Sequence, residues 1–299
     1  MKPYWPILAA ASVGIQVGAA MVATRFVVAE SGPATLAMFR YAIGALCLLP
    51  VLWWQRQPIR FARRDILPIA GLGIIQFGLL IALLNFGLSL IPAARAALLF
   101  ASFPLLTMIV AALLGREKLT LNKSIGVLLT ILGVALALGE RLLDPAGGTG
   151  FLGEAAVLLA ALCGAICSVL YRPYLQRYPT LPIGAFAMLA SVAFLLLLSI
   201  PEGLFAGWAG YSAQGWVAVL FIGVSSGIFY AVWLWALRHA SPTRVTIFLG
   251  LSPVAAGLFG ALFLAEPLTL PLLAGLAVLL LGLWLATRPD APAGRQVGQ

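Results

Sequence analysis

The chain has 299 residues, of which 63% are hydrophobic and only 9% are charged, and its mean hydropathy is +1.07. Soluble domains carry about 25% charged residues, so this composition excludes a soluble globular protein and indicates one that lies in a lipid bilayer. The net charge of +9 does not indicate nucleic-acid binding, because the basic residues lie in short clusters between apolar runs and not on one exposed face.

Ten apolar runs are each long enough to cross a bilayer as a helix, which takes about 20 residues. In chain order we expect helices at 5–29, 33–54, 66–91, 93–114, 122–139, 151–175, 181–200, 214–237, 243–264 and 268–287. The breaks between them contain a proline, a glycine or a charge. The first run is too long for the apolar core of a cleavable signal. The sequence therefore predicts an all-α membrane protein with one transmembrane domain over residues 1–299.

Residues 93–140 and 242–289 repeat each other in one register. Matching pairs include Arg95 with Arg244, Pro104 with Pro253, Glu117 with Glu266, Gly126 with Gly275, and Gly133 with Gly282. The loop charges do not match, since Arg116 and Lys118 correspond to Ala265 and Pro267. Bases mark the cytoplasmic side of short membrane loops, so equivalent loops face opposite compartments. We expect two inverted five-helix repeats, at about 1–144 and 145–290, as in many transporters.

The basic residues also predict the orientation. If both termini are cytoplasmic, 14 basic residues lie on the inner side and three on the outer side, with Arg40 inside the second span. The three outer ones are Arg25, Arg95 and Arg141. Under the positive-inside rule this bias places both termini, including the tail 291–299, in the cytoplasm.

Short motifs in the second, fourth and ninth spans resemble a known family. The second span reads Met38-Phe39-Arg40-Tyr41 with Gly44, and the fourth and ninth each carry a proline followed by Glu-x-Leu-Thr, at 117–120 and 266–269. Over essentially its whole length the chain is similar to the drug/metabolite transporter superfamily, and in particular to its EamA-type ten-helix exporters. It also resembles the YddG-like aromatic amino acid exporter branch, although Val13-Gly14 stands where such proteins often carry Trp-Gly. The resemblance implies export of amino acids or related metabolites across the bacterial inner membrane.

The nine acidic residues all lie in loops or at helix ends. A proton-coupled exporter of cations needs a titrating carboxylate near the middle of the bilayer, so we predict transport without obligatory proton coupling. Glu117 and Glu266 are equivalent in the repeat, and we expect each to accept hydrogen bonds from the backbone at the start of the following helix, with a functional pair as the alternative. Arg40 either reaches outward, pairs with backbone carbonyls or binds a substrate carboxylate.

Polar and aromatic residues at mid-depth are the candidates for a substrate site. Ser226, Tyr230 and Trp233 follow one another at i, i+4 and i+7 and so share a helix face. We assign substrate binding to Gln16, Gln76, Ser102, Ser226, Tyr230 and Ser252. Proline removes an intrahelical hydrogen bond, so Pro104 and Pro253 are expected hinges for alternating access, with kinks that serve only packing as the alternative.

These observations favour an exporter of amino acids or related small metabolites, and of aromatic amino acids above all. Its partners are the small-molecule substrate and the lipid bilayer, with no cofactor and no nucleic acid, and we expect it to work as a monomer. The alternative is a multidrug or hydrophobic-compound exporter of the same fold. An integral membrane enzyme is disfavoured because His239 is the only histidine and no catalytic motif is present. A structural or lipid-scrambling protein is a further alternative.

Overall fold

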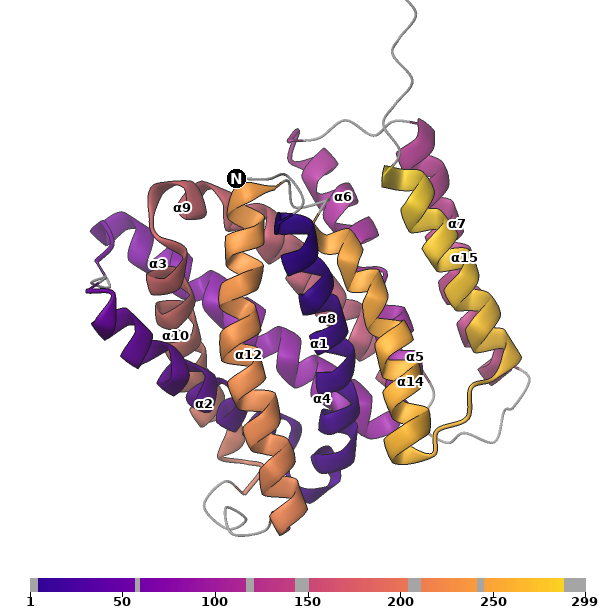
Figure 1. The fold of residues 1–299 in the computed structure, drawn as a ribbon, viewed down its shortest axis with the longest axis horizontal. Coiled ribbons are helices and arrows are strands. Elements are labelled where there is room, and N and C mark those ends of the chain that lie inside the picture. The colour runs from indigo at the N-terminus through magenta and orange to yellow at the C-terminus, as the bar shows by residue number, and fades with distance from the viewer. Residues whose placement is uncertain are drawn as a thin grey trace, which may run out of the picture.

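The structure is a computed structural model that describes residues 5–56, 60–116, 121–142, 151–203, 211–240 and 245–287. Over these residues all regular secondary structure is helical (Figure 1). In chain order the elements are α1 (Trp5–Val27), the 3-10 helix η1 (Val28–Glu30), α2 (Pro33–Trp54), α3 (Arg63–Gly73), the π-helix η2 (Ile74–Leu79), α4 (Leu80–Leu90), α5 (Ala93–Phe100), α6 (Phe103–Leu113), α7 (Leu121–Leu142), α8 (Leu152–Leu170), α9 (Arg172–Arg177), α10 (Thr180–Ser199), α12 (Ala213–His239), the 3-10 helix η3 (Ile247–Leu251), α14 (Ser252–Leu264) and α15 (Leu270–Thr287).

Seven helical segments of the described chain are long and apolar enough to cross a membrane. They are Trp5–Glu30, Pro33–Trp54, Arg63–Leu90, Ala93–Leu113, Leu152–Arg177, Thr180–Ser199 and Ala213–His239. Three further helical stretches are apolar but shorter, at Ser124–Gly133, Phe248–Leu264 and Leu270–Gly282. Each predicted span overlaps one of these ten segments. Since only seven of the described segments are both long and apolar enough for a full crossing, the count of ten spans stays a prediction.

Contacts between residues far apart in the sequence define one end of the bundle. The carboxylate of Glu202 accepts a hydrogen bond from the Thr35 backbone N–H at 2.7 Å. The Arg25 side chain, in the last turn of α1, donates to the Leu88 carbonyl at 2.6 Å. We call this the acidic end, after Glu30, Glu202 and Glu266.

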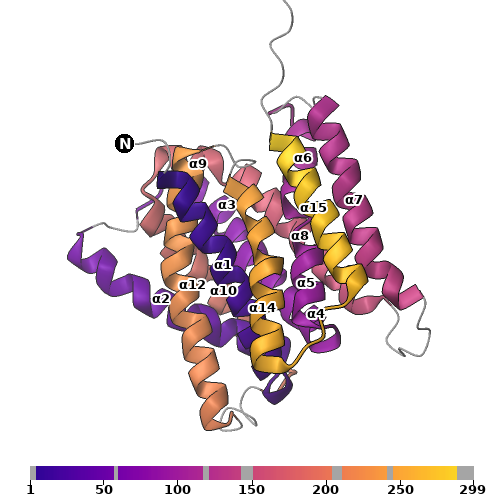
Figure 2. The same ribbon diagram turned by 45° about the vertical axis from the view of Figure 1, so that its right-hand side comes forward.

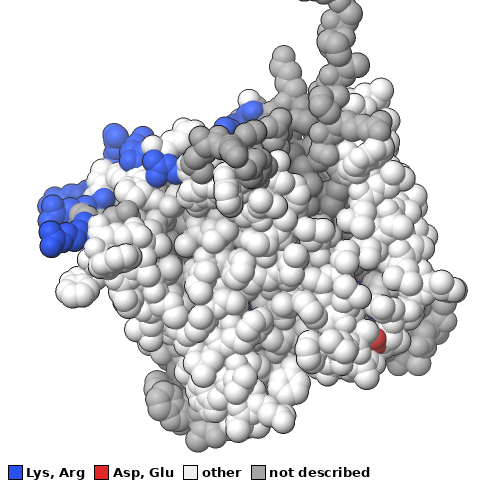
Figure 3. All heavy atoms as spheres, in the orientation of Figure 1, with Lys and Arg blue, Asp and Glu red and all other residues white. Residues whose placement is uncertain are grey.

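The other end of the bundle carries many of the bases. Arg177 pairs with Asp65 at 2.8 Å, and the Tyr178 hydroxyl accepts from the Ala62 backbone N–H at 3.1 Å. We call it the basic end, after Arg63, Arg64, Arg172 and Arg177. Figure 3 shows the visible bases along the upper margin of the molecule, above a wide band without charged side chains. A band of this kind is what lipid contact requires, because hydrocarbon does not solvate charge.

Corresponding helices of the two halves run in opposite directions. α1 ends at the acidic end, whereas α8 ends at the basic end, where the Arg116 side chain donates to the Val169 carbonyl at 2.6 Å. Likewise α2 begins at the acidic end, beside Glu202, and α10 begins at the basic end, just after Tyr178.

Helices of one half also exchange packing partners with their counterparts in the other half. α1 packs against α12 and α14, and its counterpart α8 packs against α4 and α6. α2 packs against α12, and its counterpart α10 packs against α3. α7 and α15 lie side by side along one flank of the bundle (Figures 1 and 2). The packing partners of α1 and α2 are thus exchanged between the halves relative to those of α8 and α10.

Glycines let helices of the two halves approach closely. A Cβ added at Gly18 of α1 would lie 2.4 Å from the Ser252 carbonyl oxygen of α14, and one at Gly227 of α12 would lie 2.7 Å from the Gly44 carbonyl oxygen of α2. In membranes, helix association depends on such close backbone packing by small residues. These two crossings bring α1, α2, α12 and α14 together around the centre of the bundle.

Candidate substrate-binding cavity

A cavity lies between the two halves, near the middle of the bundle. Side chains of α1, α2, η2, α4, α5 and α6 line it from the first half, and those of α12 and η3 from the second. Its volume is about 100 Å³, which leaves room for several water molecules or part of a small solute. Of the six predicted binding residues, the structure brings four into this wall: Gln16, Gln76, Ser226 and Tyr230.

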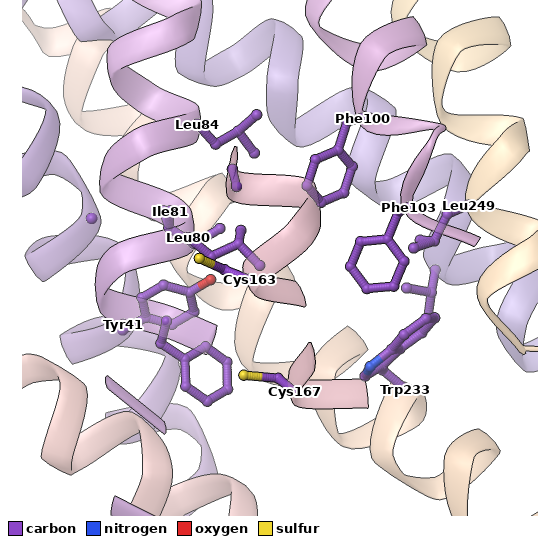
Figure 4. Packing of buried hydrophobic residues seen from close by; sticks show 14 of the residues in the cluster. Tyr41, Leu80, Ile81, Leu84, Phe100, Phe103, Cys163, Cys167, Trp233 and Leu249 are labelled. Atoms are coloured by element: carbon purple, nitrogen blue, oxygen red, sulfur yellow. The ribbon is translucent and has the colours of Figure 1, made fainter. Parts of the chain in front are cut away.

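Aromatic rings form two sides of the cavity. On one side Phe77 packs edge to face between Tyr41 and Tyr230, with ring centroids 4.7 and 4.3 Å apart. The rings of the other side are those of Phe100, Phe103 and Trp233 (Figure 4). Edge-to-face contacts match the positive rim of one ring to the negative face of the next. The two aromatic sides therefore present firm apolar surfaces to whatever enters.

Two hydrogen bonds join the halves at the cavity wall. The side-chain amide of Gln16 on α1 donates to the Ser225 hydroxyl of α12 at 3.0 Å. The Arg40 Nε of α2 donates to the neighbouring Ser226 hydroxyl at 2.7 Å. Gln16 and Ser226, which the sequence suggested as direct substrate ligands, are therefore partly engaged with protein groups.

The crossing of α2 and α12 explains how Arg40 reaches Ser226. Gly44 lies one turn after Arg40, and Gly227 directly follows Ser226. Because neither glycine has a side chain, the two backbones meet closely enough that an added Cβ at Gly227 would clash with Gly44. The close approach brings the Arg40 side chain within hydrogen-bonding distance of α12.

Ser102 and Ser252 lie outside this cavity. Ser102 borders a separate apolar hollow with Leu105 and Leu158, and Ser252 is fully enclosed beside Gly18. The sequence placed them at the same depth as Gln16 and Gln76, without placing them on a particular helix face. The structure breaks both helices at these residues, which changes the direction in which the side chains point.

The prolines Pro104 and Pro253 begin new helical segments. Pro104 is the second residue of α6, after a turn at Ala101 and Ser102, and Pro253 is the second residue of α14, after the 3-10 helix η3. Proline is well tolerated in the first turn of a helix, where its missing N–H has no intrahelical partner. The expected mid-helix kinks are thus helix breaks at equivalent positions of the two halves.

Sequence reasoning left Arg40 out of the assigned site, although it considered a carboxylate-binding role for it. The structure places its side chain in the cavity wall, where it is only 8% exposed. The sequence did contain a signal for this role, because Arg40 is the only basic residue away from the predicted membrane interfaces. The rings of Tyr41, Phe77, Phe100 and Phe103 carried no comparable signal, since aromatic residues are common throughout the apolar runs.

Three carboxylates at the acidic end bind helix N-termini of the opposite half. Glu202 accepts from the start of α2, and Glu30 accepts from the Ser212 backbone N–H at the start of α12. Glu266 accepts from the Ala93 backbone N–H of α5 at 3.1 Å. The expectation that Glu266 serves the following helix was therefore wrong. Residues 265–269 between α14 and α15 are not helical, and the Glu266 carboxylate reaches α5 from this segment. Glu117 lies outside the described residues.

A family comparison identifies what kind of protein this is. The model of the EamA-like transporter family matches residues 4–139 and again residues 151–288. The chain belongs to the EamA-like transporter family. It is therefore a membrane transporter and not an enzyme, and the double match agrees with the two halves seen in the fold.

Relatives of this EamA-like transporter come from archaea and bacteria. An uncharacterized transporter of Archaeoglobus fulgidus is 26% identical, over 91% of this chain and 94% of its own length. The uncharacterized transporter YoaV of Bacillus subtilis is 23% identical, over 90% and 92%. A probable terminal-alkyne amino-acid exporter of Streptantibioticus cattleyicolor is 30% identical, over 68% of this chain and 67% of its own.

One solved crystal structure has the same fold. It superposes with a TM-score of 0.70 at 22% sequence identity, and the match covers 93% of this chain and 95% of the other. The overall arrangement of the helices is thus also found in a solved structure.

Proposed function

We propose that this EamA-like transporter exports amino acids or related small metabolites across the bacterial inner membrane, and aromatic amino acids above all. The observation that carries the proposal is the cavity between the halves, which has aromatic rings on two sides and polar side chains from both halves. Ligand pockets have this mixture of apolar walls and a few placed polar groups. The relative named as a probable amino-acid exporter supports the same substrate class.

Transport would follow alternating access in an inverted repeat of ten spans. The opposite directions of corresponding helices and their exchanged partners support this architecture. In such repeats the substrate site lies near the midplane between the halves, as the cavity does. Pro104 and Pro253 would serve as the hinges, because each marks a helix break next to the cavity helices. The basic end would face the cytoplasm, together with both termini, and the monomer would be the working unit.

No acidic side chain belongs to the described residues that line the cavity. A carboxylate that exchanges a proton for cargo needs to titrate within reach of that cargo. The transporter would therefore move its substrate down the substrate gradient, without obligatory proton coupling.

The test is exchange of labelled compounds by purified protein in liposomes. We expect liposomes preloaded with unlabelled phenylalanine to take up labelled phenylalanine and tryptophan with no pH gradient, and protein-free liposomes to take up neither. If no amino acid of a full panel exchanges, but a hydrophobic drug does, the multidrug alternative is correct. Uptake that appears only with an imposed proton gradient would contradict the proposed lack of coupling.

A further inference from the structure

Arg40 differs from the other side chains of the cavity wall. Among the described residues that line the cavity it alone carries a charge. It lies seven residues after the start of α2, about 10 Å along the helix axis, and its side chain is buried. A charge held in an apolar site costs free energy unless it is paired. The groups around Arg40 therefore show whether the protein itself supplies that partner.

Few groups of the protein offset the free-energy cost of burying the Arg40 charge. Its Nε donates to the Ser226 hydroxyl at 2.7 Å, and its guanidinium carbon lies 5.5 Å from the centre of the Tyr41 ring. No carboxylate of the described residues forms an ion pair with it. The two terminal guanidinium nitrogens have no hydrogen-bond acceptor within that part of the chain, and the residue lines the cavity. Through these two nitrogens an arginine can donate one hydrogen bond to each oxygen of a planar anion.

We propose that the Arg40 guanidinium binds the carboxylate of the transported molecule. This rests on the proposed function and narrows it to small molecules that carry a carboxylate. A guanidinium presents paired N–H donors that match both oxygens of a carboxylate. Ser226 holds the guanidinium through Nε and so leaves the other two nitrogens for the cargo. A phosphate-bearing cargo fits less well, because the wall offers one base and not a cluster.

The rest of the cavity then fixes how the cargo lies. The ring of Tyr41 is next to Arg40 and begins the row of rings that continues through Phe77 to Tyr230. A carboxylate held at Arg40 directs the apolar part of the same molecule along this row. The charged group and the aromatic side chain of one amino acid would therefore be recognised at adjacent places.

A series of three related ligands tests the proposal on the wild-type protein. L-Phenylalanine, phenylacetate and L-phenylalaninamide share the ring, but only the first two carry a carboxylate. A ligand that binds the native state raises the midpoint of thermal unfolding. We expect phenylalanine and phenylacetate to raise the midpoint of the detergent-solubilised protein and the amide to raise it far less. An equal rise with all three would overturn the proposal.

Variants of Arg40 test whether this side chain binds the carboxylate. We expect Arg40→Gln to weaken phenylalanine binding about tenfold or more, because a hydrogen-bonded charge is lost. Arg40→Lys, which keeps the charge but not the paired donors, should lie between Arg40→Gln and wild type. Ser226→Ala should weaken binding less than Arg40→Gln does. The matched control is Arg60→Gln, at an exposed arginine outside the cavity, which should bind as wild type does. Wild-type affinity in Arg40→Gln would overturn the proposal.

The outcomes separate this inference from the proposed function. If Arg40-dependent binding of phenylalanine is found, but liposomes show no flux of any amino acid, the carboxylate site stands and the export function fails. If amino acids cross and Arg40→Gln transports them with unchanged apparent affinity, the function stands and the role of Arg40 fails.

Discussion

At the scale of single residues, Tyr230 is the aromatic side chain for which we propose a contact with the transported molecule. Its ring packs against Phe77 at a centroid distance of 4.3 Å on one side and borders the cavity on the other. It stands one turn after Ser226 on the same face of α12. The ring can therefore stack on an apolar side chain whose carboxylate is held near Ser226.

We predict that Tyr230→Ala weakens the apparent affinity for phenylalanine and tryptophan up to about tenfold, since an aromatic pair contributes about 0.5–1.5 kcal/mol beyond area burial. Alanine, as a small cargo, should lose little, and Tyr230→Phe should behave as wild type does. The control is Phe263→Ala, at a ring 70% exposed and outside the cavity. Transport assays that compare the apparent affinities for phenylalanine and alanine test this prediction. Equal losses for phenylalanine and alanine, or none for either, would remove Tyr230 from the site.

The regularity of a helix decides how well a sequence pattern places its side chains. Ser226, Tyr230 and Trp233 all border the cavity because α12 is unbroken, so their spacing translates directly into one face. Ser102 and Ser252, which the sequence placed only by their depth, lie outside the cavity, and each sits at a helix break. The Arg40 to Ser226 contact needed the crossing of two helices, which no local pattern describes.

At the scale of helices, the crossing of α2 and α12 sets the geometry of the cavity. Gly44 and Gly227 let the backbones touch, and Arg40 and Ser226 meet beside this point. A side chain at Gly227 would press on the backbone of α2, which cannot move aside as a flexible side chain can.

We predict that Gly227→Ala lowers the free energy of unfolding by about 1–3 kcal/mol, as overpacking of a dense interior does. It should also weaken phenylalanine binding, because the helices must separate at the Arg40 contact. Gly71→Ala is the matched control, since an added Cβ there meets nothing within 4 Å. Thermal unfolding and ligand binding of both variants check this. A Gly227→Ala protein as stable and as tightly binding as Gly71→Ala would contradict the role of the crossing.

The helix boundaries show which elements the sequence could predict. The ranges 33–54 and 214–237 match α2 and α12 closely, because clear loop residues border long apolar runs. The breaks before Pro104 and Pro253 were not predicted, since a proline within an apolar run equally suggests a kink. The π-helix η2, which carries Gln76, left no local signal that hydrophobic periodicity could detect.

At the scale of the whole molecule, the two halves meet around the cavity and are fastened together at both ends. Glu30, Glu202 and Glu266 bind helix N-termini across the halves at the acidic end. Arg177 and Asp65 pair across the halves at the basic end. The proposed alternating access would require these contacts to break in turn, so that the cavity opens to one side and then to the other.

The most direct test of this account is the accessibility of one cavity residue from each side of the membrane. In a variant lacking Cys47, Cys163 and Cys167, Gln76→Cys places a thiol in the cavity wall. We predict that a membrane-impermeant thiol reagent modifies it when added to either side of oriented vesicles, that modification stops phenylalanine exchange, and that phenylalanine slows modification from both sides. Modification from one side only, or modification that phenylalanine does not slow, would contradict transport through this cavity by alternating access.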